Sequence, residues 1–191
     1  MHTTRQTLLK RVRDVQDHEA WQEFVAIYAP LLYRYARARS LDHNEAEDIA
    51  QQTMVDVARK MPDFEYDPRR GRFKGWLKTI VNNNIISALR KQRPRLAESS
   101  EFQREQLREK SVDEIWEQQW RREHLAYAMA LVQKEVKRET FEAFRLVVIE
   151  GRPVSEVAKR LGLSANQVYV AKHRITHRIK TKVSVLTDDG L

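Results

Sequence analysis

The chain contains few residues that would interrupt a helix. Only five glycines and five prolines occur among its 191 residues, while leucine, alanine, glutamate, lysine, arginine and glutamine are plentiful. Glycine and proline destabilise helix interiors most, and the plentiful residues are the strongest helix formers. An apolar fraction of 41% is enough for helical cores. The sequence therefore predicts an all-α fold of long helices joined by few turns.

The chain has no cysteine. Disulfides and thiolate zinc sites are thereby excluded, and the composition suits a reducing compartment. No apolar run approaches the roughly 18 to 20 residues that cross a bilayer. The first residues also lack the hydrophobic core of a signal peptide. We expect a cytoplasmic protein with no membrane partner.

The positive charge of the chain is concentrated in two places. The net charge is +8, but residues 69–95 carry nine Lys or Arg and no Asp or Glu. Residues 152–182 carry a net charge of +7, while residues 42–56 contain five acids and no base. Two basic patches and one acidic patch suggest three separate partner surfaces.

The first basic patch coincides with a predicted helix. Pro68 and Gly71 indicate a turn, and Pro94 ends the helical pattern that follows. A basic face of this kind suits a polyanion such as nucleic acid, and a solvated basic helix is the alternative. The apolar residues lie on one arc of the helix: Phe73, Trp76, Leu77, Ile80, Val81 and Ala88.

Two aromatic residues precede this helix in an irregular loop. Phe64 and Tyr66 stand close to Arg69 and Arg70 in the sequence. Aromatic side chains beside cations stack on unpaired bases in many single-strand-binding proteins. They also pin loops to their own core, and the sequence leaves both interpretations open.

The acidic patch lies on a predicted helix over residues 44–61. Asp42 or Asn44 is placed to cap it, with Glu45 or Glu47 completing a capping box. Val55 is an apolar residue at the centre of the predicted polar face, which indicates either a contact surface or an isolated surface valine. That predicted face consists of Asp48, Gln51, Gln52, Val55, Asp56 and Arg59.

Other segments complete a predicted two-domain arrangement. Residues 4–15 and 21–35 show helical periodicity, with Asp17 as an N-cap and Pro30 as either a kink or a helix start. Residues 96–111 mix charges with few apolar residues, so we predict a linker that is partly helical or disordered. Helical patterns resume over residues 112–137 and 138–150.

The segment from Arg152 to Val183 has the pattern of a helix-turn-helix. A short apolar-periodic stretch meets Gly162 at a tight turn, and Ser164 is placed to cap a second helix. With its net positive charge, this unit is typical of DNA-binding domains. The second helix should present Asn166, Gln167, Tyr169, Lys172, His173 and Thr176 outward, followed by Arg174, Arg178, Lys180 and Lys182 toward its end.

A metal-dependent nucleic-acid enzyme is a weaker alternative. His173 and His177 lie four residues apart, as metal-binding pairs do. No suitably placed third ligand is evident, and the neighbouring cations Lys172, Arg174 and Arg178 would repel a metal ion. We therefore predict no metal, no cofactor and no catalytic residues.

Together these segments resemble the extracytoplasmic-function (ECF) group of bacterial RNA polymerase sigma factors. AEDIAQQTM (residues 46–54) is similar to the group's core-polymerase-binding helix, and residues 64–83 are similar to its promoter-melting segment. SEVAKRLGLSANQV (residues 155–168) resembles its second DNA-binding domain. Two positions depart from the family pattern, which often has an acid where Ser87 stands and a basic residue where Ala171 stands.

The resemblance implies a non-enzymatic protein that binds core polymerase and promoter DNA, with an anti-sigma factor left open as a further partner. Residues 1–95 would form the region 2-like domain and residues 112–191 the region 4-like domain. The alternative is a free-standing helix-turn-helix regulator that never contacts polymerase. By resemblance, core polymerase would contact Asp48, Gln51, Gln52 and Val55; minus-10 DNA would contact Phe64, Tyr66, Arg69, Arg70, Arg72, Lys74, Lys78 and Asn83; and minus-35 DNA would contact Ser164, Asn166, Gln167, Tyr169, Lys172, His173, Arg174 and Arg178.

Overall fold

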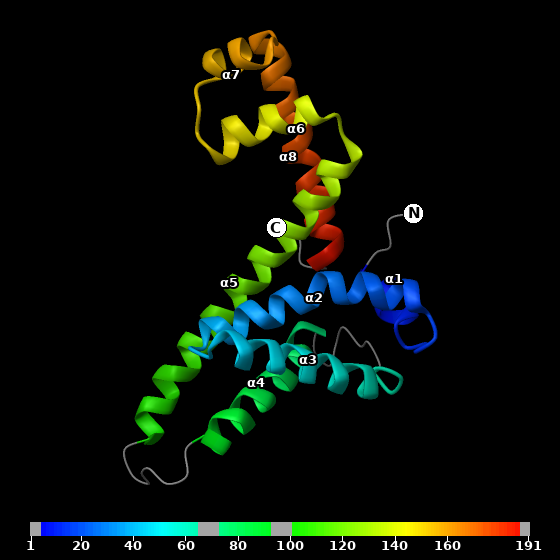
Figure 1. Cartoon of the computed structure of the whole chain (residues 1–191), viewed down its shortest axis with the longest axis vertical. Helices are drawn as coiled ribbons and strands as arrows, with labels where there is room; N and C mark the ends of the chain where they lie inside the picture. Colours follow the sequence, from blue (N-terminus) through cyan, green and yellow to red (C-terminus); the bar gives the residue numbers. More distant parts are fainter. Residues whose placement is uncertain (1–4, 65–72, 93–100, 188–191) are drawn as a thin grey trace. The chain divides into compact units, whose positions relative to one another are not determined.

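The computed structural model describes residues 5–64, 73–92 and 101–187. Across these ranges the regular structure is helical, with no strand, which confirms the all-α fold (Figure 1). The chain divides into two compact units, Met1–Glu123 and His124–Leu191. None of the described helices is both long enough and apolar enough to span a bilayer.

The first unit begins with helices α1 (Arg5–Arg11) and α2 (His18–Ala38). Asp17 caps α2 as predicted, since its carboxylate accepts a hydrogen bond from the backbone N–H of Ala20 at 3.0 Å. The Arg11 guanidinium donates to the same carboxylate at 2.8 Å. Pro30 lies inside α2, so the chain continues as one helix through that position.

Helix α3 (His43–Lys60) follows with the capping box that the sequence predicted. The Asp42 carboxylate accepts from the Glu45 backbone N–H at 2.9 Å, and the Glu45 side chain accepts from the Asp42 backbone N–H at 2.7 Å. Figure 1 shows α3 lying alongside α2 and α4 (Phe73–Gln92). Residues buried in this core include Phe24, Tyr28, Leu31, Tyr35, Ala46, Val57, Phe73, Leu77, Val81 and Ile85.

Helix α5 runs without a break from Glu101 to Glu135. It therefore crosses the predicted boundary between a linker over residues 96–111 and a domain that starts at residue 112. The boundary between the two compact units lies within α5, after Glu123. The physical reason is that Trp116 and Trp120, each 1% exposed, pack on aromatic residues of α2. The part of α5 before residue 124 therefore belongs to the first unit.

The second unit contains the rest of α5, α6 (Arg138–Phe144), a π-helical turn η1 (Arg145–Ile149), α7 (Val154–Leu161) and α8 (Ala165–Thr187). Gly162 makes the turn between α7 and α8, with a φ of +64°. This conformation is unfavourable for any residue that has a Cβ atom. The core of this unit comprises Ala143, Leu146, Val157, Ala158, Val168 and Ala171.

Candidate nucleic-acid interface

The exposed face of α3 carries the predicted polymerase contacts. Asp48, Gln51, Gln52 and Val55 are all exposed, and Val55 is 60% exposed. They fall on one side of the helix because Ile49, Ala50, Thr53 and Val57 occupy the opposite, buried side. An apolar side chain surrounded by amide and carboxylate groups is compatible with a protein contact.

Asp56 was wrongly placed on that exposed face. It is 8% exposed, and its carboxylate accepts hydrogen bonds from Asn84 at 3.0 Å and from Gln52 at 3.3 Å. Arg59 forms an ion pair with it. Burial raises the pKa of Asp56, but the hydrogen bonds from Asn84, Arg59 and Gln52 outweigh burial and hold this pKa below its usual value. Asp56 therefore joins α3 to α4.

The predicted minus-10 residues fall into three groups: those outside the described residues, the pair Asn83 and Phe64, and the two lysines of α4. Tyr66, Arg69, Arg70 and Arg72 lie outside the described residues, so their roles stay predictions. Asn83 is exposed on α4. The ring of Phe64 lies 4.5 Å from that of Trp76 and 5.9 Å from that of Phe73, which favours the interpretation that this aromatic pins the loop to the core.

Lys74 and Lys78 form the third group, and both contact α5. The Lys74 Nζ lies 2.7 Å from Oε2 of Glu117, and the Lys78 ammonium pairs with Asp113. Their side chains are 14% and 24% exposed. Sequence reasoning missed these pairs, because it assigned residues 112 onward to the second domain.

Aromatic contacts hold this part of α5 in place. The ring centroid of Trp116 lies 4.9 Å from that of Tyr35, and Trp120 lies 5.9 Å from Tyr28. The Lys74 ammonium lies 5.4 Å from the ring centroid of Trp120, within cation–π range. The tryptophans stand four residues apart on one helix face, and that spacing was the available sequence signal for a buried contact.

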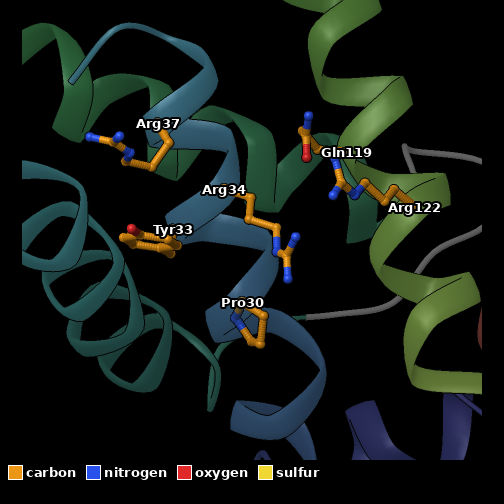
Figure 2. Close-up of a pocket in the computed structure, with 6 residues that line it drawn as sticks. All are labelled: Pro30, Tyr33, Arg34, Arg37, Gln119 and Arg122. Carbon is orange, nitrogen blue, oxygen red and sulfur yellow. The ribbon is translucent and has the colours of Figure 1, made fainter. Parts of the chain in front are cut away.

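A basic cleft lies where α5 meets the second half of α2. It has a volume of about 420 Å³ and is lined by Pro30, Tyr33, Arg34, Arg37, Gln119 and Arg122 (Figure 2). In Figure 2 the side chains of Arg34 and Arg122 extend toward each other beneath Gln119, while the Arg37 guanidinium points away.

Two hydrogen-bond acceptors beside this cleft explain the positions of Arg34 and Arg37. Arg34 pairs with Glu123 at 3.0 Å, and burial raises the pKa of the Glu123 carboxyl above its usual value. Arg37 donates instead to the backbone oxygen of Leu41 at 3.1 Å. Arg34 is therefore paired within the protein, and the Arg37 guanidinium is held away from the cleft (Figure 2).

The start of α8 is capped by a reciprocal pair of hydrogen bonds. The Ser164 Oγ accepts from the Gln167 backbone N–H at 3.2 Å, and the Gln167 side chain accepts from the Ser164 backbone N–H at 2.7 Å. Ser164 is thus the predicted N-cap. The Oε1 atom of Gln167 already accepts a hydrogen bond in this cap. A hydrogen bond from a base edge to the same oxygen would therefore compete with helix capping.

The predicted minus-35 residues lie together on α8. Asn166, Tyr169, Lys172, His173 and Arg174 are exposed, whereas Val168 and Ala171 face the core of the second unit. Since Ala171 is buried, its departure from the family pattern leaves the exposed face of the helix unchanged. Farther along the helix, Arg178 lies 3.9 Å from Glu135 and Lys182 lies 2.7 Å from the same residue.

Comparison with known proteins shows similarity to sigma factors. Residues 24–95 match the family model for sigma-70 region 2. The ECF RNA polymerase sigma factor SigE of Mycolicibacterium smegmatis is 28% identical over 157 residues, which make up 81% of this chain and 58% of SigE. The ECF RNA polymerase sigma factor RpoE of Cereibacter sphaeroides is 33% identical over 86 residues, which make up 45% of this chain and 46% of RpoE.

A solved structure, that of CnrH in complex with the cytosolic domain of CnrY, matches 93% of this chain and 95% of its own, with 20% identity and a TM-score of 0.39. The chain spans about half the length of the curated relatives that it matches. The matched region 2 begins within α2 and covers α3 and α4, the two helices that carry most of the predicted polymerase and minus-10 residues. Residues 24–95 are thus similar to sigma-70 region 2, and the chain is similar to RNA polymerase sigma factors of the extracytoplasmic-function group.

Proposed function

We propose that this protein binds core RNA polymerase and directs promoter-specific initiation of transcription. The observation that carries the proposal is the sigma-70 region 2 match over residues 24–95, within which α3 presents Asp48, Gln51, Gln52 and Val55 to solvent. A largely polar face with one apolar residue suits docking on another protein. In this role the protein has no catalytic activity of its own and acts in the cytoplasm, where polymerase and promoter DNA are found.

The DNA contacts are divided between the two units. In the first unit, Asn83 and the segment around residues 64–78 hold the opened minus-10 strand. In the second unit, α8 reads the minus-35 element through its exposed face, with Ser164, Asn166, Gln167, Tyr169, Lys172, His173, Arg174 and Arg178 as the contact residues. The support for this second role is that α8 follows a glycine turn and carries exposed polar and basic side chains at its start.

Reconstituted transcription tests this function. Purified core polymerase should form a stable complex with the full chain and then initiate at discrete positions on genomic fragments. Core polymerase alone serves as the control. DNA binding by the chain without complex formation would instead favour the free-standing regulator. An anti-sigma partner stays a prediction, tested by co-purification from cells of the source organism.

A further inference from the structure

We propose that residues 113–123 of α5, here called the strap, compete with promoter DNA for Lys74 and Lys78. The inference rests on the proposed function, because it concerns regulation of the same minus-10 surface. In the docked state the strap occupies both lysines, so the isolated protein binds DNA through this surface more weakly than its charge would allow.

The first support comes from the ion pairs. The Glu117 carboxylate lies 2.7 Å from the Lys74 ammonium, and Asp113 pairs with Lys78 one helical turn later in α4 and one turn earlier in α5. A carboxylate oxygen offers lysine the same kind of acceptor as a DNA phosphate oxygen. A phosphate that approaches either lysine therefore competes with a carboxylate for the N–H groups of the ammonium.

The second support is that a specific packing contact positions these carboxylates. Trp116 and Trp120 are buried against Tyr35 and Tyr28, and the Lys74 ammonium lies over the ring of Trp120. Buried aromatic pairs contribute more than exposed ion pairs. The tryptophans thus anchor the strap, which places Asp113 and Glu117 beside the two lysines.

The third support is that this contact is imperfect. Among the described residues, Trp116 Nε1 and Gln119 Oε1 are buried and find no hydrogen-bond partner. Buried polar atoms without partners cost free energy, and they regain hydrogen bonds in water once the strap leaves. These two unpartnered atoms lower the free energy needed to release the strap.

A matched pair of variants tests the competition. Glu117→Gln removes the carboxylate beside Lys74, whereas Glu114→Gln makes the same charge change on the same helix at an exposed position. The probe is a fluorescein-labelled single strand of about 30 nucleotides of mixed sequence, titrated with the full chain in about 0.15 M salt. Glu117→Gln should bind about 2- to 5-fold more tightly than the wild type, the range typical of one exposed ion pair. Glu114→Gln should change the affinity less than about 1.5-fold, because salt screens an isolated surface charge.

A second set of variants distinguishes an error in the strap proposal from an error in the proposed function. Lys74→Ala and Lys78→Ala should weaken binding, and Lys74→Ala should remove the gain made by Glu117→Gln. If both lysine variants bind as the wild type does, the minus-10 assignment of these lysines is wrong. If the lysines matter but Glu117→Gln and Glu114→Gln behave alike, the strap proposal is overturned while the proposed function stands.

A distance measurement provides an independent readout. The chain has no cysteine, so Gln22→Cys with Gln118→Cys introduces two unique, exposed labelling sites on α2 and on the strap. Spin labels at these positions should give one distance in the free protein and a longer, broader distribution when the same DNA strand is saturating. An unchanged distribution with DNA bound would contradict displacement of the strap.

Discussion

The Nζ atom of Lys74 lies 2.7 Å from Oε2 of Glu117, so a cation predicted to contact DNA already has an anionic partner within the protein. The two residues are 43 positions apart in the sequence, and α4 and α5 bring them together. The positive charge counted along residues 69–95 is therefore larger than the charge that this surface offers to a ligand.

Replacement of exposed α3 residues should abolish the polymerase complex. Asp48→Lys with Gln51→Ala reverses one charge and removes one amide at the predicted docking face without touching the buried side of α3. Complex formation with core polymerase should be lost, while the melting temperature stays nearly unchanged. Glu19→Lys, an equal charge reversal at an exposed position of α2, serves as the control. An intact complex in the double variant would rule out this docking face.

Phe64 and Asn83 should respond differently to replacement by alanine. Phe64→Ala removes a ring packed on Trp76 and should lower the free energy of unfolding by about 1 to 3 kcal/mol, measured by denaturant titration. Asn83→Ala changes an exposed side chain and should alter stability by less than about 0.5 kcal/mol.

Promoter opening provides a second readout for Asn83. Asn83→Ala should reduce the permanganate reactivity of promoter thymines more than it reduces closed-complex binding, because its contact forms with the opened strand. Tyr66→Ala is expected to behave in the same way. Equal loss of opening and of closed-complex binding would refute the melting assignment of Asn83.

Alanine replacements in two sets of α8 residues should have different effects on DNA binding. Lys172→Ala or His173→Ala should cost about 1 to 3 kcal/mol at the cognate minus-35 sequence and relax specificity, since both side chains are exposed near the start of the helix. Arg178→Ala should weaken binding to all sequences alike and lower the salt slope by about one. Binding across a randomised minus-35 library measures both effects. An unchanged sequence preference in the Lys172 and His173 variants would remove these residues from the reading set.

Asp56 should make folding stability depend on pH in the acid range. Its folded-state pKa lies below the usual value, because hydrogen bonds from Asn84, Arg59 and Gln52 outweigh the effect of burial. The folded state therefore holds this proton less tightly than the unfolded chain. The resulting stability is complete above the unfolded-state pKa of about 3.9 and is lost as the pH falls through the lower, folded-state pKa.

Asp56→Asn should remove this part of the acid dependence. It should also lower the free energy of unfolding at about pH 6 by about 1 to 3 kcal/mol, because charge-assisted hydrogen bonds to Asn84 and Arg59 are lost. Urea titrations at several values between about pH 3 and pH 6 measure both effects. Asp63→Asn, on the exposed turn after α3, is the matched control. Parallel stability curves for wild type and Asp56→Asn would contradict the prediction.

The local features of the chain could be predicted from the sequence because they depend on neighbouring residues. Asp17, Asp42 and Ser164 act as helix caps, and each bonds a backbone N–H three residues along. Gly162 makes the turn before α8 because it tolerates a positive φ. The buried sides of α3 and α8 follow from apolar spacing in the same way.

Tertiary structure decided what helical periodicity leaves open, namely which polar residues are buried and which segment packs on which. Asp56 lies at the edge of the buried arc of α3, and its burial is offset by hydrogen bonds from Arg59 and Gln52 on α3 and from Asn84 on α4. Trp116 was recognisable as a core residue, but its apolar character does not specify the core that it joins, and its packing on Tyr35 places the start of α5 in the first unit. Hydrophobic burial is non-directional, so apolar spacing identifies the face of a helix that is buried, whereas the partner of that face depends on shape and charge brought together from distant parts of the chain.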